Sequence, residues 1–426
     1  MAGRPRAAIL VTGDEVLRGR VRDRNGGVLA RSLDERGVAV ERIVVVGDGL
    51  DALEGALAEV LRSGVDLVVT SGGLGPTHDD RTMEAVARAT GRPLALDRRA
   101  LDLVRAARAP LRRREGISSE TRRAVEEKQA SLPEGALVLP PAGTAPGCVL
   151  EHAGVTVCVL PGPPWELAAM WEAALGTPPL VRILAAAPGG CAALLRLHGV
   201  VESRVVEVLA GAPAEVRDAV EIGICARAAE IEISARGPDA AVAALEHLLE
   251  EAFGERLYAR RGETALDIVA ATLRERGERV AVAESCTGGL LGCRLTAPPG
   301  ASEWFLGGVI AYANALKEGL LGVDPALLAR HGAVSAECAG AMAGGVRSLT
   351  GADWAVSVTG IAGPGGGTPH KPVGVVYLGL ADPSGGVGVE ELLVRGDRER
   401  VREQAAASAV HLLRRALRRA APVRSS

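Results

Sequence analysis

The chain has 426 residues, and its 49 lysines and arginines against 52 aspartates and glutamates give a formal net charge of −3. This balance excludes a polybasic, histone-like protein, and the 2% aromatic content leaves little material for stacking nucleic-acid bases. Hydrophobic residues at 48% are typical of a folded protein, and the length predicts two or three domains.

The seven cysteines are odd in number and form no C-x-x-C pair, so neither a disulfide framework nor a zinc site is expected. The first apolar run, residues 7–11, meets Gly13, Asp14 and Glu15 too early for a signal peptide. No apolar run approaches the roughly 20 residues that span a bilayer. We therefore expect a cytoplasmic protein with no membrane partner and no nucleic-acid partner.

Residues 1–180 show a strand–helix rhythm. The pattern predicts strands at 7–12, 38–46, 65–70 and 155–160, with helices at 25–36 and 51–62 between the first three. The strands are almost continuously apolar, which is typical of a parallel sheet covered on both faces. The expected fold is a doubly wound α/β domain whose ligand lies at the carboxyl ends of the strands.

Three polar clusters follow strands or precede helices in this domain: residues 12–15, 23–25 and 71–80. The glycines of the third let backbone N–H groups approach a phosphate, although the segment is neither a G-x-G-x-x-G nor a G-K-[ST] motif. The carboxylates beside them suit a hard divalent cation such as Mg²⁺ or Mn²⁺, and the candidate ligands are Asp14, Glu15, Asp79 and Asp80. The alternative is that these aspartates are helix caps and turn residues.

Two further domains are expected. Strands at 193–200 and 230–235 with helices at 203–209 and 240–253 predict a small α+β linker module over 181–260. Residues 261–426 read as a second α/β domain, with strands at 280–283, 308–312, 355–358 and 373–379 and a closing helix over 398–419.

The strongest chemical signal is Ser285, in the segment from Ala283 to Gly289 between an apolar strand and the helix 290–295. A hydroxyl at such an elbow is exposed, and the following N–H groups can stabilise an oxyanion. The motif is not G-x-S-x-G, and His331 is the closest histidine along the chain, so a base must come from elsewhere.

Lys317 is the candidate base because it falls in the first turn of a helix expected to begin near Asn314. A helix N-terminus and burial both favour the neutral amine that can accept a serine proton. The chain uses lysine at only three positions, 128, 317 and 371. The alternative is an exposed helical lysine, and Cys286 is the rival nucleophile because a helix N-terminus can lower a thiol pKa.

A glycine-rich loop, residues 360–368, follows the strand at 355–358 and can wrap closely around a ligand phosphate. A structural turn is the alternative.

The motifs GDEVLRG, DRN, TSGGLGPTHDD and LPGPPWE resemble the N-terminal, molybdopterin-binding-like domain of the CinA (competence/damage-inducible protein A) family, which is similar to MoaB and MogA proteins. The resemblance implies a metal-dependent ADP-ribose pyrophosphatase using Mg, Mn or Co. It also makes Asn25 a site residue, Gly72, Gly73 and Thr77 phosphate contacts, and residues 161–163 the rim. Arg24 stands where the family commonly has threonine.

The motifs AESCTGG, YANALKEGLLGV, HGAVSAECAGAMAGGVRS and VTGIAGPGGGTPHKPVGVVY resemble the CinA C-terminal domain, also called PncC. The resemblance implies a nicotinamide-nucleotide amidase that needs no cofactor and converts nicotinamide mononucleotide to nicotinic acid mononucleotide and ammonia. It also implies a homodimer. The implied residues are Ser285 as nucleophile, Lys317 as base, Tyr312 as proton relay or orienting group, Thr287, Gly288 and Gly289 at the oxyanion, and Thr359, Gly363, Gly365 and Lys371 at the nucleotide.

The two activities would together recycle pyridine nucleotides. The alternative is a non-catalytic molybdopterin- or nucleotide-binding protein with a regulatory role in competence or DNA repair.

Overall fold

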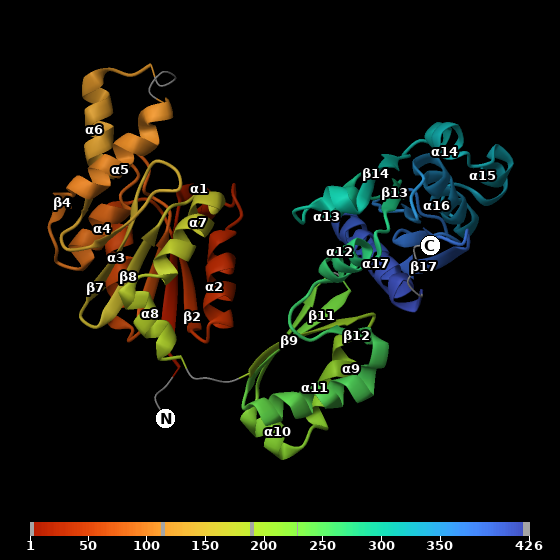
Figure 1. The fold of residues 1–426 in the computed structure, drawn as a ribbon, viewed down its shortest axis with the longest axis horizontal. Coiled ribbons are helices and arrows are strands. Elements are labelled where there is room, and N and C mark those ends of the chain that lie inside the picture. Colours follow the sequence, from red (N-terminus) through yellow and green to blue (C-terminus); the bar gives the residue numbers. More distant parts are fainter. Residues whose placement is uncertain (1–3, 112–115, 188–190, 228, 421–426) are drawn as a thin grey trace. The chain divides into compact units, whose positions relative to one another are not determined.

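A computed structural model describes residues 4–111, 116–187, 191–227 and 229–420. Contacts divide the chain into two compact units, Met1–Gly189 and Gly190–Ser426 (Figure 1). In the described part of the chain, no helix is both long enough and apolar enough to cross a membrane.

The first unit is built on a six-stranded sheet in the order β2-β1-β3-β8-β7-β6. Strands β1, β2, β3 and β8 are parallel, whereas β7 and β6 each run antiparallel to the preceding neighbour. The sheet strands are β1 (Arg6–Thr12), β2 (Ala39–Val46), β3 (Leu67–Ser71), β6 (Leu137–Leu139), β7 (Gly147–His152) and β8 (Val155–Leu160); β4 (Leu94–Leu96) and β5 (Ser131–Pro133) form a separate ribbon.

Helices cover both faces of this sheet (Figure 1). In β1, Ala7, Ile9 and Val11 face α2, α7 and α8, whereas Ala8 and Leu10 face α3, α4 and α5. This alternation between two apolar layers confirms the doubly wound α/β fold. The helices are α1 (Asp14–Leu17), α2 (Asn25–Glu35), α3 (Leu50–Arg62), α4 (Thr82–Ala89), α5 (Arg98–Arg108), α6 (Ser119–Gln129), α7 (Pro164–Leu175) and α8 (Pro178–Ala185).

The second unit begins with an antiparallel sheet in the order β10-β11-β9-β12, packed against α11. Its strands are β9 (Cys191–His198), β10 (Glu221–Arg227), β11 (Glu230–Gly237) and β12 (Leu257–Ala259), and its helices are α9 (Glu202–Ala210), α10 (Ala214–Ala219), α11 (Asp239–Phe253) and the 3₁₀ turn η2 (Gly254–Arg256). This is the small α+β module expected from the sequence.

The rest of the second unit is a mixed sheet in the order β14-β13-β15-β16-β17, in which β14, β13 and β15 are parallel. Helices α12 and α17 cover one face and α16 the other. The strands are β13 (Val280–Glu284), β14 (Phe305–Ile310), β15 (Trp354–Gly360), β16 (Val375–Ala381) and β17 (Val387–Leu393). The helices are α12 (Ala265–Arg276), α13 (Leu290–Leu295), α14 (Asn314–Leu321), α15 (Pro325–His331), α16 (Ala336–Thr350) and α17 (Arg398–Arg419).

Candidate functional site

Ser285 stands at the carboxyl end of β13, and its N–H donates to Val358 O of β15 at 2.8 Å. The preceding Glu284 is 1% exposed, and its carboxylate accepts N–H bonds from Gly289, Leu291 and Gly292 at 2.7–3.0 Å. A buried carboxylate at a helix N-terminus is stabilised by those donors and by the helix dipole. The strand end and Glu284 therefore hold the elbow that presents Ser285.

Lys317 is buried at 1% exposure, and its Nζ lies 3.2 Å from Ser285 Oγ. The same Nζ donates to the carbonyl oxygens of Ala311 at 2.7 Å and Tyr312 at 3.3 Å. Burial lowers the pKa of Lys317, and no acidic side chain forms an ion pair with it in the described chain. Two carbonyls can only accept, so a neutral amine gives them its two hydrogens and keeps its lone pair for the Ser285 hydroxyl.

Cys286 is 5% exposed, and burial raises the pKa of its thiol to about 12. The short helix α13 therefore does not lower this pKa as the sequence alternative assumed, because Glu284 already occupies its first N–H groups. At neutral pH Cys286 is a thiol and a poor nucleophile. Ser285, with the Lys317 amine beside its hydroxyl, is the better candidate nucleophile.

Some of the N–H groups that follow Ser285 are hydrogen-bonded within the turn, and others are not. Gly288 N–H donates to Ser285 O at 3.1 Å, and Gly289 N–H donates to Glu284, so both are committed to the turn. Both glycines have left-handed φ angles, +58° and +95°, which side chains disfavour. Among the described residues, the Thr287 N–H has no acceptor, and the Cys286 N–H contacts only the thiol of its own side chain. Of the three residues predicted at the oxyanion, Thr287 keeps an uncommitted N–H, whereas Gly288 and Gly289 do not, and Cys286 is the better second candidate.

Tyr312 is 60% exposed, and its phenol oxygen accepts a hydrogen bond from Arg398 Nη2 at 3.2 Å. Its backbone carbonyl, not its hydroxyl, contacts Lys317. Arg398 also donates to Gly363 O at 2.8 Å and so joins Tyr312 to the glycine-rich loop. Arg402, one turn along α17, donates to Thr287 O at 2.8 Å. Sequence reasoning missed both arginines because they lie far along the chain from Ser285.

The other residues predicted to contact the nucleotide differ in whether their polar groups are already hydrogen-bonded. Thr359 Oγ1 donates to Ala333 O at 2.7 Å, and Lys371 Nζ donates to His331 O and Val334 O at 2.7 and 2.6 Å. These two polar ends are bound to backbone carbonyls in this structure. Gly365 has open space around its Cα, so the loop is accessible there.

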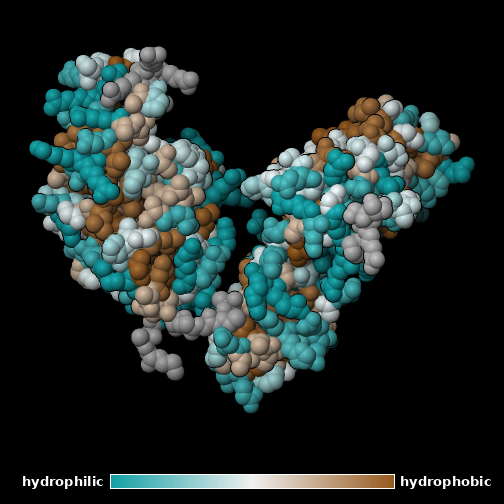
Figure 2. Space-filling model, viewed as in Figure 1, coloured by the Kyte–Doolittle hydropathy of each residue, from teal (hydrophilic) through white to brown (hydrophobic). Residues whose placement is uncertain are grey.

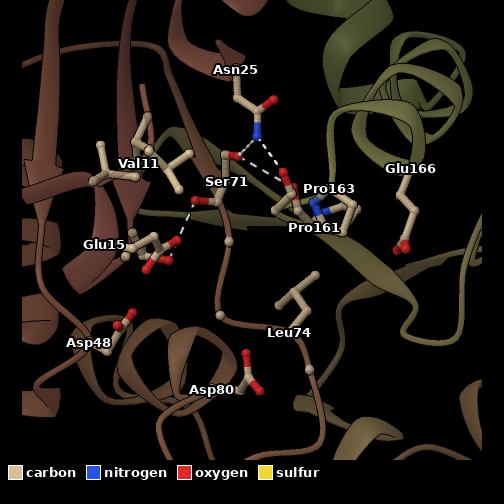
Figure 3. A pocket seen from close by; sticks show the side chains of 18 of the residues that line it. Val11, Glu15, Asn25, Asp48, Ser71, Leu74, Asp80, Pro161, Pro163 and Glu166 are labelled. Atoms are coloured by element: carbon tan, nitrogen blue, oxygen red, sulfur yellow. Dashed lines mark hydrogen bonds between the residues drawn. The ribbon is translucent and has the colours of Figure 1, made fainter. Parts of the chain in front are cut away.

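The first unit has a separate pocket of about 820 Å³ at the carboxyl ends of its strands (Figure 3). Asn25 Nδ2 donates to Ser71 Oγ at 2.8 Å and to Gly162 O at 2.6 Å, so it connects the ends of β3 and β8. The sequence clusters at 12–15, 23–25 and 71–80 and the rim at 161–163 meet here, as the parallel fold requires.

The acidic residues of this pocket are not all those expected. Glu15, Asp48 and Asp80 lie along one side and Glu166 on the other (Figure 3). Asp14 is not part of the lining, because its carboxylate pairs with Arg18 at 2.7 Å and faces Asp48 N–H. Asp48 was missed, although it follows β2 as the other clusters follow their strands. Its pKa is raised chiefly by burial and further by Glu15, Asp14 and Asp79.

The shape of the predicted phosphate loop is fixed by close packing at Gly72 and by hydrogen bonds of Thr77. A Cβ on Gly72, whose φ is +110°, would lie 2.5 Å from Thr12 Oγ1, and Gly73 has a φ of +67°. The Thr77 hydroxyl lies within hydrogen-bonding distance of the Asp79 and Asp80 carboxylates, 2.6 Å from that of Asp80, and the Thr77 N–H donates to Asp80 at 2.9 Å. The Thr77 bond is also the main cause that lowers the pKa of Asp79.

We tested whether these acids fit a divalent cation. Among the described residues, no three histidine, cysteine, aspartate or glutamate side chains are grouped as a metal site. Asp14 is turned to Arg18, and Asp79 and Asp80 are turned to Thr77. The four predicted ligands therefore do not form a ready-made metal site.

The fold and the sites define a chain with a molybdopterin-binding-type domain followed by an α/β domain with a serine–lysine pair. Residues 8–182 match the family described as a probable molybdopterin binding domain, and residues 263–417 match the CinA C-terminal domain. A CinA-like protein of Mycolicibacterium paratuberculosis is 45% identical over 429 residues, covering 97% of this chain and 98% of the relative. A CinA-like protein of Mycobacterium tuberculosis is 43% identical over 426 residues, covering 98% of each. The chain belongs to the CinA family.

Among solved structures, the competence/damage-inducible protein CihA from Agrobacterium tumefaciens is 36% identical, with a TM-score of 0.35. The match covers 36% of this chain and 96% of that one.

Proposed function

We propose that the C-terminal site hydrolyses the carboxamide of nicotinamide mononucleotide to nicotinic acid mononucleotide and ammonia. The observation that carries this proposal is the buried Lys317 amine, which lies 3.2 Å from Ser285 Oγ and, within the described residues, otherwise bonds two carbonyls alone. This arrangement supports a serine nucleophile activated by a neutral lysine. The choice of substrate rests on the family resemblance of the sequence motifs.

In the first half-reaction, Ser285 Oγ attacks the carboxamide carbon while its proton passes to Lys317 Nζ. The N–H groups of Cys286 and Thr287, which follow Ser285 directly in the chain, would donate to the oxyanion that forms. The carbon–nitrogen bond then breaks, and the Lys317 ammonium returns its proton to the leaving nitrogen, which departs as ammonia. An acyl ester on Ser285 remains.

In the second half-reaction, water attacks the acyl carbon and gives its proton to Lys317. Collapse of this intermediate breaks the ester bond, the proton returns to Ser285 Oγ, and the pyridine carboxylate leaves. Lys317 thus acts as base and acid in each half, and the two carbonyls of Ala311 and Tyr312 stabilise its charged state between them.

Trapping with hydroxylamine tests for the acyl-enzyme. Hydroxylamine intercepts an acyl ester, so the wild type should convert nicotinamide mononucleotide partly to the hydroxamate, whereas the variant Ser285→Ala should form none. A wild type that releases ammonia but never forms hydroxamate would contradict the covalent route.

The N-terminal pocket supports a second candidate activity, hydrolysis of the pyrophosphate of ADP-ribose. The favouring observation is that Glu15, Asp48, Asp79 and Asp80 line one pocket together with the glycine-rich segment 72–75. The pKa of Asp48 is raised there, first by burial and then by the nearby carboxylates. The test is ADP-ribose hydrolysis with added Mn²⁺, Mg²⁺ or Co²⁺ and with EDTA. Hydrolysis that needs the metal supports the proposal, and none under any condition contradicts it.

We also propose that the protein forms a homodimer. Exposed leucines gather over α14, where Figure 2 shows a hydrophobic area, and a neighbouring groove of about 1030 Å³ runs along α16 and β17. Its apolar lining includes Leu320, Leu349, Val387 and Val389. Light scattering after gel filtration measures the assembly, and the variant Leu320→Glu should shift a dimer toward monomer.

A non-catalytic binding role remains the opposing account. It predicts no ammonia release from the wild type and no effect of Ser285→Ala on ligand affinity. The cytoplasmic location stays a prediction from the sequence.

A further inference from the structure

Another cavity of the second unit lies at the junction between the α+β module and helix α17, away from Ser285. It has a volume of about 460 Å³, within the range of small-molecule sites, and both parts belong to the same compact unit. Four arginines line it against two glutamates, and His198 forms part of its wall. The lining residues are His198, Gly199, Phe253, Glu255, Arg256, Glu390, Arg414, Arg415 and Arg419.

Arg414 is the least exposed of these arginines, at 4%. Its guanidinium lies 4.6 Å from the centre of the Tyr258 ring, and its Nε donates to His411 Nδ1 at 3.3 Å. It forms no ion pair with a carboxylate in the part of the chain that the structure describes. A buried guanidinium needs a counter-charge, and neither an aromatic ring nor a histidine nitrogen supplies a full one.

The acids near Arg414 are already engaged with other groups. Glu390 pairs with Arg415, and Glu255 lies 3.6 Å from Arg419. Glu230 of β11 accepts a hydrogen bond from His411 Nε2 at 2.6 Å, since His411 Nδ1 accepts from Arg414, and Glu230 also lies 3.7 Å from Arg196. Arg256 is exposed and has no polar partner among the described residues. The cavity therefore keeps an excess of positive charge.

The histidine in the wall does not offset this charge. His198 stacks on His411 with ring centres 3.7 Å apart, and its Nδ1 lies 3.4 Å from Arg415 Nη1. Burial, with His411, Arg415 and Arg414 beside it, lowers the pKa of His198 to about 2, so its ring is neutral. A neutral ring lets the arginines converge without a further positive charge between them.

We propose that this junction cavity binds a small phosphate-bearing molecule, with Arg256, Arg414 and Arg419 as its contacts. Guanidinium groups recognise phosphate oxygens through paired N–H donors, and the cavity volume leaves room for a phosphate with a small organic group. The ligand would bind across β9, η2 and α17, and so would join the α+β module to the C-terminal domain. This inference is independent of the chemistry at Ser285.

Calorimetric titration of the full chain with inorganic phosphate, inorganic pyrophosphate and AMP tests the proposal. The variants Arg256→Gln and Arg419→Gln each remove an exposed lining arginine, which spares the buried Arg414 and the fold. The matched control is Arg418→Gln, the neighbouring exposed arginine of α17, which does not line the cavity. Each variant removes one positive charge.

We expect at least one of the three probes to bind, and its dissociation constant to rise about tenfold in each lining variant but less than about twofold in Arg418→Gln. Comparing the probes shows whether phosphate alone suffices or the attached group contributes. Absence of binding by all three would overturn the proposal. So would binding that the lining variants leave unchanged or that Arg418→Gln weakens equally, since the latter would reflect overall charge.

Discussion

Glu284 and Ser285 are neighbours in the chain, but the Glu284 side chain bonds the start of helix α13 and the Ser285 side chain contacts Lys317. The Glu284 carboxylate accepts three N–H groups from the start of α13, while Ser285 Oγ lies 3.2 Å from Lys317 Nζ. Because Glu284 takes these donors, the N–H groups nearest Ser285 are left for another acceptor. The acid that fixes the turn therefore also limits which backbone N–H groups are available for the proposed reaction.

The first prediction concerns the stability of this turn. The variant Glu284→Ala leaves three N–H groups without their charged acceptor, and we expect the free energy of unfolding to fall by about 3 kcal/mol. Urea unfolding of the full chain measures this free energy, taken from the transition in which the C-terminal domain unfolds. Glu275→Ala is the matched control, since Glu275 is exposed on α12. Equal stability of the two variants would contradict the role given to Glu284.

The second prediction is a pH dependence. Burial lowers the pKa of Lys317 below its ordinary value of 10.5. In the proposed mechanism the neutral amine is the active form. The value of kcat/KM should therefore rise with pH and level off before the pH reaches that ordinary value. A pH series of ammonia release from nicotinamide mononucleotide measures this. A kcat/KM that falls as the pH rises through this range would argue against a lysine base.

The third prediction separates Cys286 from the exposed thiols. With its pKa raised to about 12, Cys286 should resist alkylation by iodoacetamide at neutral pH, whereas the exposed Cys225 and Cys293 should react. Peptide mass spectrometry reads each position. Rapid labelling of Cys286 with loss of activity would instead support the thiol as nucleophile.

The fourth prediction assigns Arg398 to substrate binding. Arg398 bridges Tyr312 and Gly363 at the edge of the site, so Arg398→Gln should raise KM about tenfold and change kcat by less than about threefold. Arg395→Gln, an exposed arginine just before α17, serves as the control. Steady-state kinetics of both variants decide the matter, and a loss confined to kcat would show that Arg398 acts on the chemical step instead.

The sequence predicted the interior of the fold better than its edges. Strand β8 (Val155–Leu160) and helix α17 (Arg398–Arg419) lie at the predicted residues, because a continuous apolar run and a long helical period are strong signals. Strand β14 was expected at 308–312 but spans Phe305–Ile310. It is an edge strand with alternate exposure and two glycines, so its apolar pattern is weak. The opposite edge strand, β17, carries Glu390 and Glu391 and was missed.

The sequence likewise predicted some residues of the candidate sites and missed others. Ser285 and Lys317 could be paired from the sequence because Ser285 follows strand β13 and Lys317 lies in the first turn of helix α14, each within a distinctive local pattern. Arg398 and Arg402 could not, since only the packing of α17 against α13 brings them near the elbow. Asp48 had a usable signal, a carboxylate just after β2, but no adjoining motif drew attention to it.

The most direct test of the central claim is ammonia release from nicotinamide mononucleotide with EDTA present, by the wild type and by Ser285→Ala, Lys317→Ala and Cys286→Ala. The account predicts a loss of about a thousandfold or more in kcat for the first two variants and near wild-type activity for Cys286→Ala. Activity that survives Ser285→Ala, or a wild type that releases no ammonia, would contradict it.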